Sequence, residues 1–216
     1  MQAMAEDLSA YRKSYEQGAL TVSGSKKNPF DQFKNWFKEV EDSKGIEEVN
    51  AMTISTLGPD NFPKNRIVLL KHYDEAGFVF YTNYDSEKGK AIASNPNVCI
   101  SFFWPNLERQ VIKGIAKKVS QKQSDDYFHS RPVGSQLGAI ASPQSKVIPH
   151  REFLEERLKN LKNQFDDKTI PKPENWGGYR VEPQEFEFWQ GRPNRLHDRL
   201  RYLSKNGLWE RERLAP

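Results

Sequence analysis

The segment RIVLLKHYDEAGFVFYTN, residues 66–83, decides the fold class of this 216-residue chain. It begins with a run rich in β-branched and apolar residues, passes through the turn-forming stretch Asp74–Gly77, and ends in a second run of apolar and aromatic residues. Two such runs joined by a short turn predict neighbouring antiparallel strands.

The same pattern continues on both sides of this segment. Residues 51–57 (AMTISTL), 97–104 (NVCISFFW) and 109–119 (RQVIKGIAKKV) read as further strands, and only residues 86–94 between them have a helical pattern. Closely spaced strands with short connections indicate an antiparallel sandwich or barrel rather than a doubly wound sheet. No glycine fingerprint follows a strand, which argues against a dinucleotide-binding fold. We therefore predict a mainly β protein with flanking helices.

The clearest helix is expected over Pro29–Asp42, where Asn28 caps a first-turn proline. Its apolar residues, Phe33, Trp36, Phe37 and Val40, fall on one helical face. Weaker patterns predict further helices over residues 8–17, 124–130, 135–141 and 150–166, the last with an apolar stripe expected to pack on the barrel. A strand over residues 179–189 and a hairpin turning at Asn206-Gly207 complete the chain.

Composition narrows the class of protein. The net charge is only +4, and the single cysteine, Cys99, lies in an apolar run where we expect it in the core. No internal disulfide, bilayer-spanning run or metal-ligand spacing of histidine and cysteine is present. The polar N-terminus is unlike a secretory signal. These features predict a cytoplasmic protein without a metal or membrane partner, with residues 1–27 as a flexible N-terminal segment and residues 28–216 as a single domain.

Basic residues are concentrated in particular segments. In FWQGRPNRLHDR, residues 188–199, an extended backbone would place Arg195, His197 and Arg199, with Arg201 beyond them, on one face. Such a face is either an exposed charged edge or an anion site. Arg66 and Lys71 bracket an apolar strand, and strand parity would place them on opposite faces, where they could serve two anions or lie at the surface.

A further cluster resembles a phosphate cradle. Tyr127 and Arg131 share a helix face, and Ser135 follows Pro132, so two hydroxyls and a guanidinium could surround a dianion or simply be solvated. A basic module for nucleic acid is a competing interpretation, but its cations should form a surface stripe with exposed aromatic residues. In this chain the basic residues are instead interspersed among the apolar residues of the predicted strands.

The motifs appear in a specific order along the chain: RIVLLKHYD, FYTN, LERQV, YFHSRP, QS, WGG, EFWQG and RLHDR. Together they resemble the pyridoxine (pyridoxamine) 5′-phosphate oxidase family, from about Arg12 to the C-terminal RLAP. The resemblance implies a split antiparallel β-barrel that binds FMN, and a homodimer with FMN at the subunit interface. It implies oxidation of pyridoxine 5′-phosphate and pyridoxamine 5′-phosphate by dioxygen to pyridoxal 5′-phosphate, with hydrogen peroxide and, from the amine, ammonia as products.

The resemblance also assigns roles to residues. The positions that match FMN-binding residues are Arg66, Ile67, Val68, Leu69, Leu70, Lys71, Tyr81, Thr82, Lys88, Gln110, Gln144, Ser145, Trp189 and Arg199. The positions that match substrate-binding residues are Arg12, Tyr15, Lys71, Tyr127, Arg131, Ser135, Arg195, Leu196 and His197. Arg195 and His197, beside the substrate ring, are the expected catalytic residues, and the segment from Arg12 to Tyr15 matches one that closes over the site.

Two positions depart from the family pattern. Glu87 stands where an arginine is common before the lysine, so Lys90 is a candidate to replace a lost FMN phosphate contact. Ser14 stands where an acidic residue is common. The alternative function within the same fold is another FMN split-barrel oxidoreductase or a flavin reductase, which would bind FMN without oxidising pyridoxine 5′-phosphate.

Overall fold

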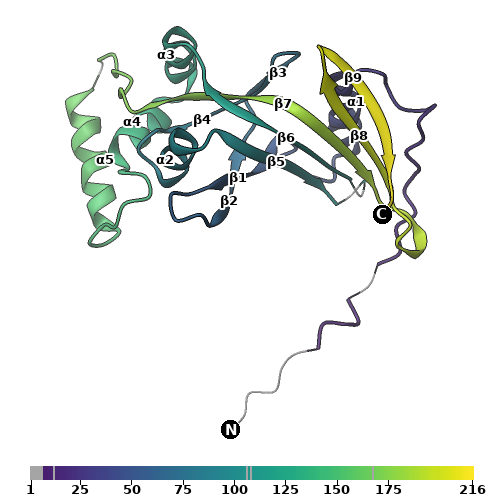
Figure 1. Ribbon diagram of the computed structural model, residues 1–216. Coiled ribbons are helices and arrows are strands. Elements are labelled where there is room, and N and C mark those ends of the chain that lie inside the picture. Colours follow the sequence, from purple (N-terminus) through teal and green to yellow (C-terminus); the bar gives the residue numbers. More distant parts are fainter. Residues whose placement is uncertain (1–6, 12, 106, 108, 167) are drawn as a thin grey trace. The chain divides into compact units, whose positions relative to one another are not determined.

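The computed structural model describes residues 7–11, 13–105, 107, 109–166 and 168–216 (Figure 1). Most of the ordered elements are strands. In chain order the elements are α1 (Pro29–Ser43), β1 (Ala51–Leu57), β2 (Pro63–Leu69), β3 (His72–Asp74), β4 (Gly77–Asn83), α2 (Glu87–Ser94), β5 (Asn97–Trp104), β6 (Arg109–Lys118), α3 (Gln121–Ser130), α4 (Val133–Ala141), α5 (Glu152–Gln164), β7 (Trp176–Gln190), a 3-10 turn (Pro193–Arg195), β8 (Asp198–Lys205) and β9 (Leu208–Leu214).

The strands form one sheet in the order β2-β1-β5-β6-β7-β4-β3, with β8 paired to β7 and β9 paired to β8. The pairings β1–β2, β1–β5, β3–β4, β4–β7 and β8–β9 are all antiparallel. This arrangement confirms the predicted class, a mainly antiparallel sheet with flanking helices.

The segment that decided the fold class contains one more break than expected. The run Arg66–Asp74 forms two strands, because β2 pairs with β1 whereas β3 pairs with β4. At the change of partner, Leu70 N–H donates to Asn50 O at 2.8 Å and Lys71 N–H donates to Val79 O at 2.8 Å. The expectation of one continuous strand was wrong, and strand parity therefore does not relate Arg66 to Lys71.

The chain divides into two compact units. Unit 1 comprises Met1–Val49, Phe103–Val111 and Phe186–Pro216, and unit 2 comprises Asn50–Phe102 and Ile112–Glu185. Each unit has its own buried apolar residues. Those of unit 1 include Phe33, Trp36, Phe186, Phe188 and Tyr202, and those of unit 2 include Ile54, Phe78, Phe80, Ile100 and Phe102.

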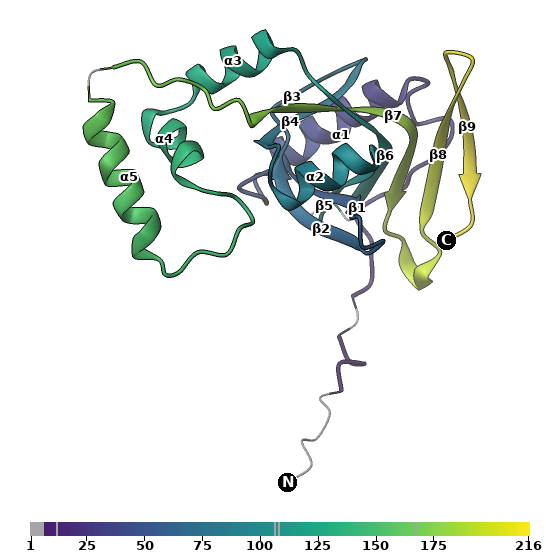
Figure 2. The ribbon, with the colours of Figure 1, turned by 60° about the vertical axis from the view of Figure 1, so that its left-hand side comes forward.

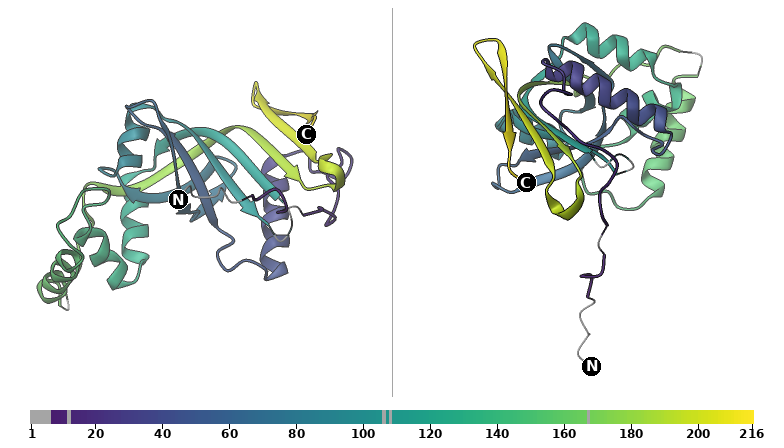
Figure 3. Two further views of the ribbon diagram at one scale, coloured as in Figure 1. Left: turned by 90° about the horizontal axis from the view of Figure 1, so that it is seen from below. Right: turned by 90° about the vertical axis from the view of Figure 1, so that its right-hand side faces the viewer.

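In unit 1, α1 forms as its sequence predicts. The Asn28 side chain accepts from Phe30 N–H at 2.8 Å, and the helix ends at Lys44, which has a left-handed φ of 52°. Its buried face packs on the last part of β7, with Trp36 edge-on to Phe188 at 5.1 Å. The hairpin β8–β9, yellow in Figure 3, turns at Asn206 and Gly207, both with positive φ, as the Asn-Gly pair predicts.

In unit 2, α4 and α5 lie against each other (Figure 2). No residue of α5 is fully buried, and its partly buried Leu158, Leu161 and Phe165 pack against a cluster that contains Phe128, Leu137, Ile170 and Trp176. The expectation that this stripe packs on the barrel was therefore wrong for most of its length. It covers α3 and α4 and meets the sheet at Trp176, where β7 begins three residues earlier than predicted.

Two further expectations were wrong. The described residues of the segment 8–17 form no helix and contain a turn at Ser9 and Ala10, where Tyr11 N–H donates to Leu8 O. Tyr11 is 86% exposed, so this segment buries too little apolar surface to stabilise a short helix. Cys99 is exposed rather than in the core, because β5 alternates and buries Val98 and Ile100 on either side of it.

Candidate active site

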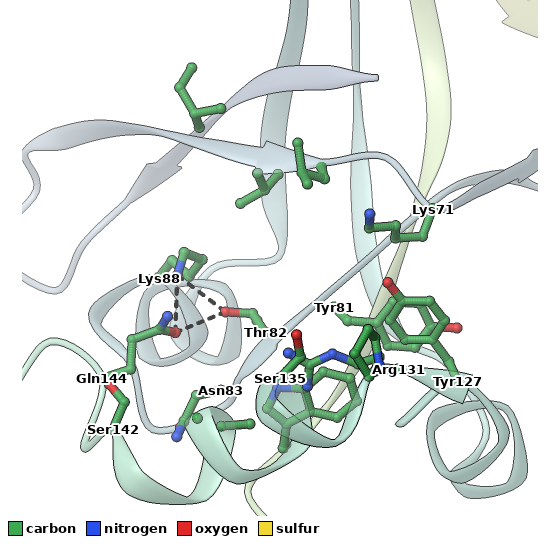
Figure 4. Close-up of a pocket in the computed structure, with 17 residues that line it drawn as sticks. Lys71, Tyr81, Thr82, Asn83, Lys88, Tyr127, Arg131, Ser135, Ser142 and Gln144 are labelled. Carbon is green, nitrogen blue, oxygen red and sulfur yellow. Dashed lines mark hydrogen bonds between the residues drawn. The ribbon is translucent and has the colours of Figure 1, made fainter. Parts of the chain in front are cut away.

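Unit 2 contains a cavity of about 650 Å³. Figure 4 shows its lining side chains, which come from β2, β4, α2, α3, α4, the start of β7 and the segments that connect β2 to β3, α3 to α4 and α4 to α5. A cavity of this size is typical of small-molecule and cofactor sites. The predicted residues that line it are Ile67, Val68, Leu69, Lys71, Tyr81, Thr82, Lys88, Tyr127, Arg131, Ser135 and Gln144.

One part of the cavity is built around Lys88. Its ammonium donates to Thr82 Oγ1 at 3.1 Å and to Gln144 Oε1 at 3.3 Å, and Thr82 Oγ1 donates to the same Gln144 oxygen at 3.1 Å. The residue is only 8% exposed, and burial, followed by the nearby Arg66, lowers the pKa of Lys88. A buried ammonium that bonds to neutral oxygens keeps its charge available for an anion.

The sequence around Lys88 explains how the lysine comes to lie there. Ser86 caps α2 by accepting from Gly89 N–H at 3.2 Å. Gly89 packs directly on the preceding turn, where a Cβ would lie 2.2 Å from Tyr84 O. The cap and the close approach together fix the first turn of α2, and Lys88 lies in that turn.

A second hollow, of about 430 Å³, shares Lys88 and Gln144 with the first cavity. It is also lined by Lys64, Arg66, Glu87 and Ser145. Glu87 Oε1 accepts from Lys64 Nζ at 2.5 Å, and Glu87 Oε2 lies 4.0 Å from Arg66 Nη2. The hydrogen bond from Lys64 lowers the pKa of Glu87, so the carboxylate is ionised at neutral pH.

These contacts concern Glu87, which stands where the family pattern commonly has an arginine. The cation that meets Glu87 is Lys64, which sequence reasoning missed, whereas Lys90 is exposed. Arg66 is mostly buried and donates from Nη1 to Thr56 Oγ1 at 2.5 Å and to Lys64 O at 2.8 Å. Lys64 lies two residues from Arg66 on a strand, so alternation from Arg66 was the signal that could have identified it.

Another part of the first cavity is formed by Tyr127, Arg131 and Ser135. Within the described part of the chain, Nη1 of Arg131 is buried and has no hydrogen-bond partner. Ser135 lies in the first turn of α4, which begins without a side-chain cap. An uncapped helix N-terminus beside a guanidinium is a favourable place for a phosphate.

Three stacked aromatic rings line this part of the cavity. The Tyr81 and Tyr127 rings stack with centroids 3.8 Å apart, and both are nearly parallel to Trp176. Burial raises the pKa of both tyrosines, so they stay protonated and can donate hydrogen bonds. Trp176, Asn83 and Ser142 also line the cavity although sequence reasoning did not select them. For Trp176 the signal was its place in the WGG motif.

Most of the remaining predicted residues belong to unit 1. The rings of Trp189 and His197 lie 4.6 Å apart, and Tyr15 meets both, at 5.8 Å and 5.6 Å. His197 Nδ1 accepts from Arg192 N–H at 3.1 Å, so the neutral ring carries its proton on Nε2. Nε2 is thereby the nitrogen that could donate to a substrate.

The extended face expected for Arg195–Arg201 was wrong in its first half. Arg195 lies in the 3-10 turn with a left-handed φ of 60°, next to Asn194 at 56°, and β8 begins only at Asp198. Pro193 fixes the turn, and strand alternation then relates only Arg199 to Arg201. Arg199 donates from Nε and Nη2 to the two Glu187 carboxylate oxygens at 2.8 Å and 3.0 Å, so its charge already has a partner.

Some predicted residues lie elsewhere. Leu70 is 4% exposed and belongs to the core, whereas Leu196 is 69% exposed. Arg12 and the side chain of Gln110 lie outside the described residues. In the part of the chain that the structure describes, no group of three or more histidine, cysteine, aspartate or glutamate residues is placed to hold a metal ion. No helix among these residues is long and apolar enough to cross a bilayer.

Two family models match the chain from residue 39 to its C-terminus, apart from residues 166–175. Residues 39–165 match the model described as pyridoxamine 5′-phosphate oxidase. The chain belongs to this family. Residues 176–216 match the model described as the pyridoxine 5′-phosphate oxidase C-terminal dimerisation region. The family predicted from the ordered motifs, and with it the prediction of an oxidoreductase, is confirmed.

Relatives and solved structures agree with this assignment. Proteins named pyridoxine/pyridoxamine 5′-phosphate oxidase from Flavobacterium johnsoniae and Pseudomonas paraeruginosa are 63% and 48% identical, over 97% and 99% of this chain and 99% and 100% of theirs. The crystal structure of PhzG from Burkholderia lata, in complex with tetrahydrophenazine-1-carboxylic acid, is 26% identical with a TM-score of 0.85 over 94% of this chain and 100% of that one. A pyridoxamine 5′-phosphate oxidase-related, FMN-binding protein from Nostoc punctiforme shares the fold at 16% identity, with a TM-score of 0.69 over 88% of this chain and 98% of that one.

Proposed function

We propose that this protein is an FMN-dependent oxidase that converts pyridoxine 5′-phosphate and pyridoxamine 5′-phosphate to pyridoxal 5′-phosphate. The observation that carries the proposal is one cavity lined by two separate sets of anion-binding side chains, Lys88 with its neutral partners and Arg131 with Tyr127 and Ser135. A reaction that joins a phosphorylated cofactor to a phosphorylated substrate needs two such sets.

The residues around Lys88 fit the phosphate of FMN. Lys88, Arg66 and Ser145 line the same hollow, and among the described residues the buried ammonium has only neutral oxygens as hydrogen-bond partners. FMN, when bound, would take a hydride from C4′ of the substrate and return the electrons to dioxygen as hydrogen peroxide. Oxidised pyridoxamine 5′-phosphate would then release ammonia on hydrolysis.

The residues around Arg131 fit the phosphate of the substrate. The Arg131 guanidinium and the hydroxyls of Tyr127 and Ser135 can donate hydrogen bonds to its oxygens, and Lys71 adds a further cation to the lining. Each charge-assisted hydrogen bond contributes about 1.5–3 kcal/mol, so these contacts could supply much of the energy that orients the ring.

Arg195 and His197 are proposed to act beside the substrate ring. Arg195 would stabilise charge that develops near C4′, and His197 would donate from Nε2 because its Nδ1 is occupied by Arg192 N–H. The C-terminal segment that matches a dimerisation region supports a homodimer, for which we propose FMN at the subunit interface.

The test starts with the purified protein: its flavin spectrum, oxygen uptake, and formation of pyridoxal 5′-phosphate, hydrogen peroxide and ammonia from each substrate. A protein that binds FMN but leaves both substrates unoxidised would exclude the proposal. Arg195→Leu should retain FMN and lose at least about 100-fold in kcat/KM. Arg151→Leu, at an exposed arginine paired with Glu155, is the matched control and should keep full turnover. Normal turnover of the Arg195 variant would remove Arg195 from the mechanism.

A further inference from the structure

The guanidinium of Arg131 is held by an aromatic ring rather than by a carboxylate. Several other arginines are held by carboxylates, for example Arg199 by Glu187, Arg201 by Glu212 and Arg213 by Asp198. Arg131 forms no ion pair with any carboxylate of the described residues, and its Nη1 is buried without a hydrogen-bond partner. Its Cζ instead lies 4.8 Å from the centre of the Trp176 ring system.

Trp176 is itself firmly held. It is 6% exposed, is stacked at 5.6 Å from Tyr81 with an interplanar angle of 11°, and meets Phe128 edge-on at 5.2 Å. A tryptophan locked between aromatic rings can fix a guanidinium that lies on its face. The backbone of Arg131 is fixed as well, because the buried Gln136 donates from Nε2 to Arg131 O at 2.8 Å.

An aromatic partner and a carboxylate partner have different consequences. A carboxylate would orient the guanidinium but neutralise its charge, and a phosphate would then have to displace it. An indole orients the guanidinium by dispersion and cation–π attraction and leaves its positive charge and its N–H donors uncompensated. Burial lowers the pKa of Arg131, yet a guanidinium stays protonated at physiological pH, so the side chain remains a preorganised cation.

We propose that Trp176 is a positioning residue for phosphate recognition: it holds the Arg131 guanidinium, uncompensated, in the orientation that binds the phosphate of the substrate. This inference rests on the proposed function, because it assumes that Arg131 meets a substrate phosphate. It adds a residue that acts through Arg131 and explains why Trp176 lines the cavity while being mostly buried.

The experiment compares a ligand that carries the phosphate with one that lacks it. Dissociation constants for pyridoxal 5′-phosphate and for pyridoxal are measured on the FMN-loaded protein, and the constant for pyridoxal divided by that for pyridoxal 5′-phosphate gives a ratio that reports the contribution of the phosphate. Trp176→Leu should reduce this ratio by about 2- to 30-fold, the range expected for loss of a cation–π contact, and Trp176→Phe by less. Trp36→Phe, at a comparably buried tryptophan of α1, is the matched control and should leave the ratio unchanged.

A double-mutant cycle separates positioning from a general loss of packing. In an Arg131→Met background, either Trp176 substitution should change the ratio by less than about twofold, because the group that Trp176 positions is gone. Equal effects with and without Arg131, or no effect of Trp176 in either background, would overturn the inference. If Trp176→Leu does not fold, the Trp176→Phe cycle decides in the same way. A wild-type protein that binds both ligands equally would instead contradict the proposed function.

Discussion

Replacing Lys88 with methionine should weaken FMN binding without lowering the thermal stability of the FMN-free protein. The substitution keeps a long unbranched side chain and removes the buried charge. It leaves no buried group unsatisfied, because Thr82 Oγ1 still donates to Gln144 Oε1 once the ammonium has gone. In this one variant the dissociation constant for FMN should therefore rise, whereas the thermal midpoint of the FMN-free protein should not fall.

The magnitudes follow from the contacts. A hydrogen bond to a charged group contributes about 1.5–3 kcal/mol, so loss of the ammonium should raise the dissociation constant for FMN by about 10- to 150-fold. Burial lowers the pKa of Lys88, so its charged form opposes folding at neutral pH. Replacing buried ionic groups by apolar ones is often neutral or stabilising by ~1–4 kcal/mol. We expect the lower end, because Lys88 already bonds to two oxygens, and hence a thermal midpoint that is unchanged or a few degrees higher.

The assay is a titration of FMN fluorescence with FMN-free protein, together with thermal unfolding in the absence of FMN. Lys90→Met is the matched control, since Lys90 is an exposed lysine of the same helix, and its FMN affinity should stay within about twofold of wild type. Wild-type FMN affinity in the Lys88 variant would refute its role at the phosphate. A thermal midpoint lowered by several degrees would refute the claim that the buried charge opposes folding.

Three further results are expected. FMN affinity should fall as the pH rises through the lowered pKa of Lys88, because a bound phosphate would raise that pKa again and binding would then take up a proton. A series of FMN titrations from pH 7.5 to 10 should show this fall in the wild-type protein and a flat profile in Lys88→Met. Glu87→Gln should lower the FMN dissociation constant by about two- to fivefold, since it removes an anion that competes for Lys64, and weaker binding would show instead that Glu87 holds Lys64 in place. Gly89→Ala should lower both FMN affinity and the thermal midpoint, because the new Cβ would lie 2.2 Å from Tyr84 O. Gly134→Ala, with open space around its Cβ, should preserve both. Equal behaviour of the two variants would contradict the argument that Gly89 is needed for the close approach.

Local patterns were sufficient for much of the fold. The cap at Asn28-Pro29 and the apolar face behind it predicted α1 to within one residue at its end, and the Asn206-Gly207 turn predicted the last hairpin. These elements follow from interactions among residues that are close in sequence, such as side-chain caps and positive-φ turn positions. The family motifs likewise identified most of the cavity lining, from Lys71 to Gln144.

Long-range pairing decided what local patterns could not. The run Arg66–Asp74 contains no glycine or proline that would mark a break, and only its change of partner from β1 to β4 creates the break at Leu70 and Lys71. The exposure of Cys99 depends on which face of β5 is covered, and a one-residue change of register would reverse it.

The sequence by itself therefore determined the antiparallel class, the family, and most of the cations and hydroxyls that line the candidate site. The tertiary structure decided the charge state and the orientation in which those groups are presented. Only there does Lys88 become a buried cation among neutral oxygens, Glu87 meet Lys64, and Arg131 lie on the face of Trp176. The physical reason is that burial and pairing between residues distant in the chain set the electrostatics of a site, and a linear pattern of residue types does not record them.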